Sequence, residues 1–159
     1  MSRLESFRRR LTAQIEGLNW AMAQTADIAG DILELGLGNG RTYSHLREYG
    51  NRRVWAVDQV LQCHPNSTPP QQDFLHGDAG TMMQKLLQEG RTFGLIHSDL
   101  GNGNKEMSAQ LHIDLSPLIA ALAMPGGLVV SQEPLVGLTQ IDGPASVPAE
   151  RYNFYRRTS

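Results

Sequence analysis

Three aspartates that each close an apolar run are the side chains of this sequence best suited to chemistry. Asp58 ends "RRVWAVD", Asp78 ends "DFLHGD" and Asp99 ends "TFGLIHSD". A carboxylate can accept hydrogen bonds from two neighbouring hydroxyl groups, hold a cationic group or take up a proton. His97, two residues before Asp99, is a second candidate base. If these runs are strands, the candidate groups gather at strand ends.

The tetrapeptide LGNG occurs twice, at Leu37–Gly40 and Leu100–Gly103. The first copy belongs to the pattern E-x-G-x-G-x-G, Glu34–Gly40, in which glycines let the backbone turn sharply and approach a ligand. A dinucleotide fingerprint would need a third glycine where Arg41 stands, and no G-x-x-x-x-G-K-[ST] phosphate loop is present. The pattern therefore predicts a ligand loop of another kind.

Apolar, strand-like runs alternate along the chain with segments of helical periodicity. Strands are expected at residues 30–38, 52–58, 73–78, 92–100 and 127–135, and helices at residues 2–24, 41–50, 79–90 and 106–127, with Pro117 kinking or restarting the last helix. Residues 59–73 read as an irregular crossover, residues 134–148 as a loop and residues 151–158 as an edge strand. The alternation predicts an α/β fold: a doubly wound, mostly parallel sheet with helices on both faces, in three layers.

Composition and charge are those of an ordinary globular protein. The 159 residues form one domain, and a net charge of −2 gives no electrostatic footprint for nucleic acid, which makes a nucleic-acid partner unlikely on these grounds. Cys63 is the only cysteine, and no apolar stretch is long enough for a signal peptide or a membrane span. We therefore expect a cytoplasmic protein with no membrane partner.

The order of these signals resembles class I S-adenosylmethionine (SAM)-dependent methyltransferases over residues 31–133. The resemblance implies a Rossmann-like fold and SAM as cofactor. In that family the acid at the end of the second strand, here Asp58, binds the ribose hydroxyls, and Gln59 lies beside the adenosine. Asp78 would contact the adenine with the backbone of Ala79, although Asp78 is equally suited to cap the helix that follows. The implied cofactor-binding residues are Glu34, Gly36, Leu37, Gly38, Asn39, Gly40, Thr42, Asp58, Gln59, Asp78, Ala79 and Asp99.

The second LGNG follows the fourth strand, which lies beside the first strand in this fold, so the two loops should be neighbours. The family places acceptor-binding or base residues there, which makes Asp99 the first catalytic candidate and His97 the second. A packing role in the core is the favoured alternative for His97. Asp99 could instead cap its loop or contact the amino end of SAM.

The methyl acceptor has no clear signature. The chain has no [DN]-P-P-[FY] at the fourth strand end and no Pro-Cys pair, which argues against two known routes of nucleobase methylation. We expect no metal site, although oxygen ligands from Asp99, Asn102, Asn104 and Glu133 could converge. The function predicted is methyl transfer from SAM to a small-molecule acceptor, or to one held partly by a second subunit of a homodimer. The alternatives are a non-catalytic SAM-binding regulatory subunit and, less favoured, an NAD-binding oxidoreductase.

The expected organisation of the single domain, residues 1–159, has three parts. Residues 1–28 form an amphipathic helix that acts as a partial lid, residues 29–133 form the cofactor-binding core, and residues 134–159 form a loop and an edge strand.

Overall fold

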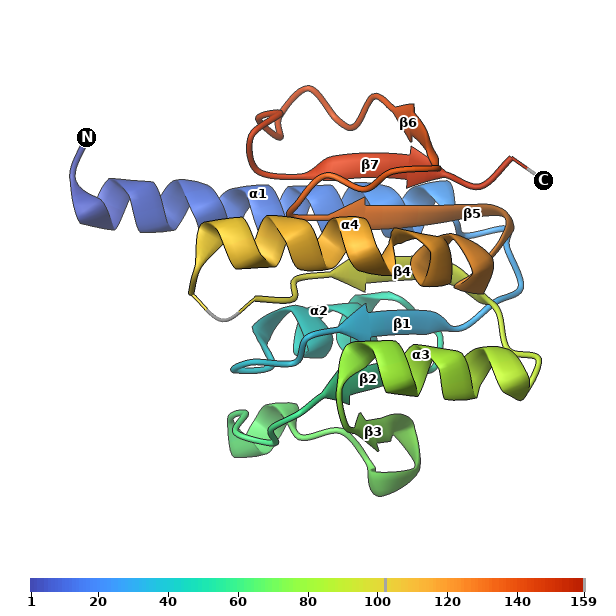
Figure 1. Ribbon diagram of the computed structural model, residues 1–159. Coiled ribbons are helices and arrows are strands. Elements are labelled where there is room, and N and C mark those ends of the chain that lie inside the picture. The colour runs from blue at the N-terminus through green and yellow to red at the C-terminus, as the bar shows by residue number, and fades with distance from the viewer. Residues whose placement is uncertain (102, 159) are drawn as a thin grey trace.

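The computed structural model describes residues 1–101 and 103–158. It has a central sheet with helices on both faces (Figure 1). In this described part the sheet has seven strands in the order β3-β2-β1-β4-β5-β7-β6. Their bounds are β1 Ile32–Leu35, β2 Val54–Asp58, β3 Phe74–His76, β4 Phe93–Ser98, β5 Ala123–Ser131, β6 Thr139–Ile141 and β7 Asn153–Arg156. The first five are parallel, and β7 runs antiparallel to β5 and β6. The predicted α/β class and mostly parallel sheet are confirmed.

The strand order reverses between β1 and β4, which pair directly. From β1 the chain moves outward to β2 and β3, then returns to β4 on the other side. Ligands of open α/β sheets bind beyond the carboxyl ends of the strands at such a reversal. The fold therefore puts the end of β1 and the end of β4 on either side of one crevice.

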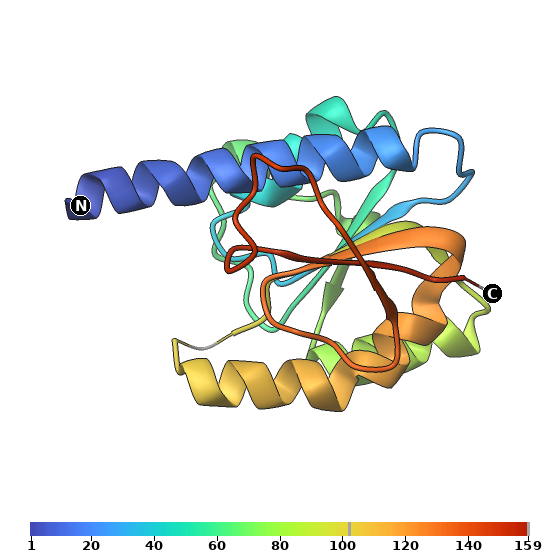
Figure 2. The ribbon, with the colours of Figure 1, turned by 90° about the horizontal axis from the view of Figure 1, so that it is seen from above.

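Helices α1 (Arg3–Gln24) and α2 (Arg41–Tyr49) cover one face, and α3 (Ala79–Gln88) and α4 (Lys105–Leu122) cover the other (Figure 2). Side chains alternate across each strand, so the sheet packs into two cores. In β1, Ile32 belongs to the core under α1 and α2, whereas Leu33 and Leu35 belong to the core under α3 and α4.

Helix α1 begins in a capping box, in which the Ser2 hydroxyl accepts from the N–H of Glu5 and the Glu5 carboxylate accepts from the N–H of Ser2. Its first turns project beyond the sheet (Figure 2), and its buried residues start only at Ala13. Gly17 lets the second half lie close to the sheet, because a Cβ there would be 3.0 Å from Cδ2 of Tyr152.

The part of the chain after α4 begins differs most from the sequence expectations. Helix α4 runs through Pro117 as one helix and ends at Leu122. Strand β5 begins directly after it, at Ala123. A register shift of β5 against β4 accommodates the Pro-Gly-Gly sequence that follows. Residues 139–141, expected as loop, form β6. Consequently residues 153–156 are not the edge strand, because β7 lies between β5 and β6. The three residues of β6 are too few to show a strand periodicity in the sequence.

A chain of buried polar groups crosses the core under α1 and α2. Glu34 of β1 and His97 of β4 are paired neighbours in the sheet, and His97 Nδ1 bonds to Glu34 Oε1. His97 Nε2 lies 2.9 Å from the hydroxyl of Tyr152, just before β7. Glu34 and His97 are fully buried, and Tyr152 is 3% exposed.

The Glu34–His97 pair holds its protons more tightly in the folded protein than in the unfolded chain. Burial raises the pKa of Glu34, and the opposing effects of His97 and Thr42 only reduce that rise. Burial by itself would lower the pKa of His97, but the charge and hydrogen bond of Glu34, with a contribution from Asp99, outweigh it and raise the pKa. The rise in the pKa of His97 depends on the negative charge of Glu34, so it is the pair as a whole that keeps its protons to higher pH than in the unfolded chain.

Replacing Gly17 by leucine should separate α1 from Tyr152. Extra side-chain volume at a closely packed position costs about 1–3 kcal/mol of unfolding free energy. Urea denaturation measures this loss. The control, Thr12→Leu on the exposed side of α1, should change stability by less than about 0.5 kcal/mol. Equal effects of the two substitutions would contradict the close packing of α1.

The buried pair should make stability fall as pH rises. Because the folded state binds more protons than the unfolded state, the contribution of the pair is present at low pH. It decreases from the ordinary pKa values of 4.5 and 6.5 upward and is lost as pH passes the raised values. Denaturation across a pH series should therefore show a steeper loss of stability with rising pH for the wild type than for the double variant Glu34→Gln/His97→Gln. Parallel profiles would refute this assignment.

Candidate functional site

The glycine loop after β1 approaches the end of β4 closely. Gly36 has φ +89° and lies so near the backbone of Asp99 that an added Cβ would overlap the Asp99 carbonyl. Gly40 has φ +88° and precedes α2, with Cβ of Ser67 2.6 Å from where its own Cβ would be. A side chain at either position would move the loop, which explains why glycine occurs there. The expected neighbourhood of the two LGNG loops is therefore present.

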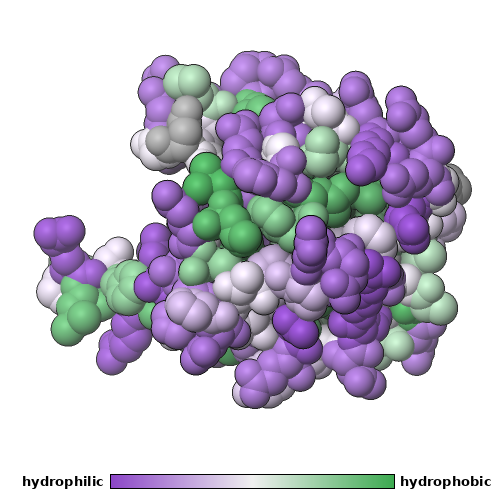
Figure 3. Space-filling model, turned by 90° about the horizontal axis from the view of Figure 1, so that it is seen from below, coloured by the Kyte–Doolittle hydropathy of each residue, from purple (hydrophilic) through white to green (hydrophobic). Residues whose placement is uncertain are grey.

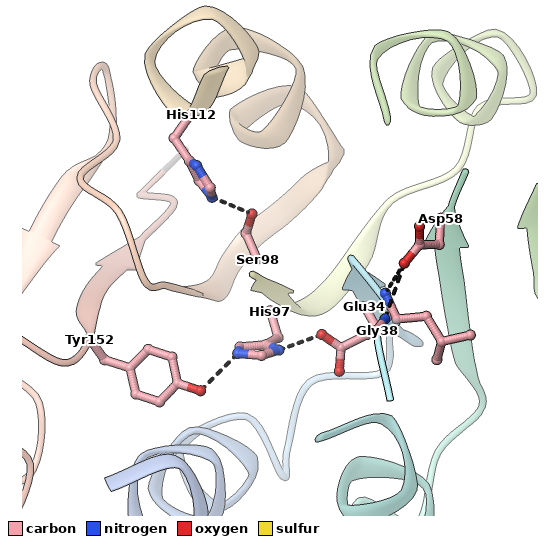
Figure 4. A network of polar contacts seen from close by, with 8 residues as sticks. Glu34, Gly38, Asp58, His97, Ser98, His112 and Tyr152 are labelled. Atoms are coloured by element: carbon pink, nitrogen blue, oxygen red, sulfur yellow. Dashed lines mark hydrogen bonds and ion pairs between the residues drawn. The ribbon is translucent and has the colours of Figure 1, made fainter. Parts of the chain in front are cut away.

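Asp58 anchors the glycine loop from the end of β2. Its Oδ2 accepts hydrogen bonds from the N–H of Leu37 at 2.8 Å and of Gly38 at 3.1 Å (Figure 4). Its Oδ1 accepts from the N–H of Val60 at 3.1 Å. A second tie comes from the crossover, where the N–H of His64 donates to the carbonyl of Asn39. One carboxylate thus fixes the shape of the loop and the start of the crossover.

A cleft of about 700 Å³ opens beside this anchor, and we call it the main cleft. One wall carries Asp58, which ends β2, and Gln59, which follows it; another carries Asp78 and Ala79 from the start of α3, and the third comes from α4. In Figure 3 a hollow with apolar surface opens at this end of the molecule, between α4 and the projecting start of α1. Four residues that the family resemblance singled out are thereby brought to one opening.

Asp78 caps α3 at the floor of the main cleft. Its Oδ2 accepts from the N–H of Thr81 at 2.9 Å. Hydrogen bonds from the side chain and the backbone of Thr81 lower the pKa of Asp78. The capping role considered from the sequence is confirmed by this geometry. Asp78 also lines the main cleft, so one residue can cap the helix and face a ligand.

A smaller hollow of about 210 Å³, the loop hollow, lies over the glycines themselves. It is lined by the Gly36–Gly40 backbone, Thr42 and Asp99, and on the far side by Arg10 and Gln14 of α1. The helix that covers the sheet therefore also covers the loop. Arg10 and Gln14 were not singled out from the sequence, because helical periodicity shows which side of a helix is apolar but not which strand end it crosses.

Asp99 lies where two hollows meet. It lines the loop hollow and also an outer hollow of about 370 Å³, whose other walls include Gln132, Glu133 and the start of α4. The N–H of Asp99 donates to the carbonyl of Leu35 at 2.9 Å, which continues the pairing of β1 with β4. Asp99, the first catalytic candidate, therefore borders both hollows.

His97 does not reach either hollow. Its side chain is fully buried, and both ring nitrogens bond to protein groups, Glu34 and Tyr152. A general base must reach the reacting proton directly or through a water molecule. The geometry therefore corrects the candidate role of His97 as a base and agrees with the packing role considered beside it. Glu34 is likewise fully buried, beneath the loop rather than in it.

A second buried pair ties α4 to the other face of β4. His112 donates from Nδ1 to the carbonyl of Ser108 at 2.8 Å, which leaves Nε2 to accept from the Ser98 hydroxyl at 3.0 Å (Figure 4). Ser98 directly precedes Asp99, so this pair fixes the strand end from which Asp99 projects. No feature of the sequence predicted this pair, because neither residue belongs to a recognisable motif.

Among the oxygen ligands considered for a metal, Asp99, Asn104 and Glu133 line the outer hollow, whereas Asn102 lies outside the described residues. Within the described residues, no three His, Cys, Asp or Glu side chains come close enough together to hold a metal ion. No helix in that part of the chain is both long and apolar enough to cross a membrane.

Comparisons with known proteins point to one protein family. The family model described as S-adenosyl-L-methionine methyltransferase matches residues 1–157. The solved structure of an S-adenosyl-L-methionine methyl transferase from Silicibacter pomeroyi DSS-3 is 37% identical, with a TM-score of 0.91 and 99% of each chain covered. A comparison with curated proteins gives no match.

More distant solved structures share the fold. An O-methyltransferase from Bacillus cereus in complex with SAH is 18% identical with a TM-score of 0.50, covering 82% of this chain and 56% of that one. TrmN from Thermus thermophilus is 17% identical with a TM-score of 0.54, covering 94% and 51%. This chain thus spans about half the length of these two proteins. The match along nearly its whole length, together with the glycine loop and the acids around it, identifies this chain as a member of the S-adenosyl-L-methionine methyltransferase family, whose cofactor is SAM.

Proposed function

We propose that this methyltransferase acts on a small-molecule acceptor bound in the outer hollow, with Asp99 as the residue that faces the acceptor. One observation carries the proposal: Asp99 lines both the loop hollow and the outer hollow. A carboxylate at such a junction can contact the cofactor on one side and take a proton from the acceptor on the other. The hydrogen bond from its N–H to Leu35 and the Ser98–His112 pair hold its backbone in place.

The main cleft fits the adenosine end of SAM. Asp58 gives three hydrogen-bond sites to backbone N–H groups, and a carboxylate has about four, so one remains for a ribose hydroxyl. Asp78 and the backbone of Ala79 lie across the cleft, at the position proposed for the adenine. The same side chain of Asp58 would thus shape the loop and hold the ribose.

The loop hollow fits the amino acid end of SAM, which carries a carboxylate and an ammonium group. We assign the carboxylate to Arg10 and Gln14 of α1, and the ammonium to the side of Asp99. Arg10 has no ion-pair partner among the described residues, although its guanidinium lies 5.1 Å from the ring centre of Phe7. This arrangement supports the role of residues 1–28 as a partial lid.

When bound, SAM supplies a methyl group activated by its positively charged sulfur. The protein then gains rate mainly by holding the acceptor in line with that carbon. Gln132, which lines both hollows, can orient the acceptor, and Asp99 can remove a proton where the acceptor must lose one. These residues would bind the acceptor, orient it and remove its proton.

The size and charge of the outer hollow favour a small acceptor over a nucleic acid. The hollow measures about 370 Å³, which lies within the usual range for small-molecule sites. Asp99, Glu133 and the single cation Lys105 surround it, so it lacks the basic stripe that a phosphate backbone requires. Screening pooled small metabolites, RNA and proteins for SAH formation tests this class directly: turnover only with RNA or protein would overturn it.

Asp58→Asn should weaken binding of SAM at least about tenfold, because the amide removes charge-assisted hydrogen bonds worth about 1.5–3 kcal/mol. Isothermal calorimetry measures the affinity. Asp73→Asn is the matched control, since Asp73 pairs with Arg53 at 2.6 Å outside the cleft. SAM binding by Asp58→Asn at wild-type affinity would contradict the assignment of the main cleft.

Arg10→Ala should raise the Kd for SAM by about tenfold through loss of one charge-assisted contact. Arg9→Ala provides the comparison, because Arg9 belongs to the same turn of α1 but contacts Met1 and does not line the loop hollow. Equal affinities of the two variants would remove α1 from the cofactor site.

Asp99→Asn should lower kcat by about 10²–10⁴-fold on an acceptor that must lose a proton, the range typical of general base catalysis. The Kd for SAM should rise by no more than about tenfold, because Asp99 also faces the ammonium group of SAM. The surface variant Glu106→Gln, at the start of α4, should turn over normally. Steady-state rates on an acceptor found in the screen give the answer, and full activity of Asp99→Asn would reject its role as base.

A further inference from the structure

The buried chain Tyr152–His97–Glu34 ends beneath the glycine loop. Glu34 lies two residues before Gly36, and its Oε1 is taken by His97 (Figure 4). Its Oε2 is fully buried without a hydrogen-bond partner among the described residues. The groups that act on this carboxylate from the loop side are Thr42 and Asp99, which both line the loop hollow. His97 therefore sets the orientation of the Glu34 carboxyl group from the side away from the loop hollow.

The other end of this hydrogen-bonded series, Tyr152, lies under α1. The Tyr152 ring packs edge-on against His97, with centroids 5.5 Å apart, and against the backbone of Gly17. Tyr152 also lines a polar hollow of about 270 Å³ together with Arg10, Gln14 and Gln132, three residues that line the loop hollow as well. One helix thus contacts the cofactor site and the anchor of the buried chain.

We propose that His97 and Tyr152 are positioning residues for the cofactor: they hold the Glu34 carboxylate in place beneath the glycine loop. The inference rests on the proposed assignment of the main cleft and the loop hollow to SAM. It gives a role to a histidine that cannot reach the acceptor and to a tyrosine that belongs to no motif. Tyr152 fixes the ring of His97 through Nε2, and His97 fixes Glu34 through Nδ1.

The pH dependence of cofactor binding follows from the titratable and polar groups in and around the buried series Tyr152–His97–Glu34. They are Glu34 from β1, His97 from β4, Tyr152 before β7 and Asp99 after β4, with uncharged Thr42 from α2 and Gln14 from α1. SAM carries a positive charge, so its binding should favour the ionised form of Glu34. Loss of the imidazole or of the tyrosine hydroxyl should alter how that affinity depends on pH.

Tyr152→Phe tests the proposal, and Tyr155→Phe is its matched control. Both tyrosines are 3% exposed, both lie in or beside β7, and each hydroxyl makes a hydrogen bond inside the protein. Tyr155 accepts from the N–H of Leu135 in the core under α3 and α4, away from the glycine loop. A merely structural role would make the two variants behave alike.

Calorimetric titration with SAM and with SAH across a pH series provides the readout. Tyr152→Phe should bind both ligands about tenfold more weakly and displace the midpoint of the pH profile, while Tyr155→Phe matches the wild type. His97→Gln, as a second variant, should lose the part of the profile that the imidazole contributes. Identical affinities and profiles for Tyr152→Phe and Tyr155→Phe would overturn the inference while leaving the cofactor site intact. Failure of the wild type to bind SAM or SAH would overturn the site assignment and this inference with it.

Discussion

The carboxylate of Asp58 is the constraint on which the site depends. It joins the end of β2 to the loop after β1 by accepting the N–H groups of Leu37 and Gly38. Two backbone N–H groups aimed at one oxygen define the loop conformation far more strictly than glycine alone, because glycine permits many conformations. The main cleft and the loop hollow both border this junction, so their relative position follows from one side chain.

Parallel pairing of β1 with β4 then brings the second half of the chain to the same place. Gly36 and Asp99 meet because their strands are neighbours, and the absence of a side chain at Gly36 leaves room for the Asp99 backbone. The two LGNG segments therefore have different surroundings despite equal sequences. The first binds Asp58 through its N–H groups, whereas the second follows Asp99 and borders the outer hollow.

The sequence predicted the sheet class and the acids of the cleft because both are local signals. An apolar run followed by glycines or an aspartate marks a strand end, and the order of such ends determines which of them meet in a doubly wound sheet. Tyr152, Arg10 and Gln14 carry no local signal, since they reach the site only through the docking of α1 and β7. The sequence did not predict strand β6, because three residues are too few to show the alternation of a strand. The role of His97 depended on its burial, which alternation along a strand does not determine.

A crystal structure of the protein with SAH would test the central claim most directly, because it shows which atoms surround each part of the ligand. We expect a ribose hydroxyl at Asp58, the adenine between Asp78 and α4, and the amino acid end in the loop hollow beneath Arg10, with sulfur directed toward Asp99. Density for SAH outside the main cleft, or in it with the adenine over the glycine loop, would contradict the account.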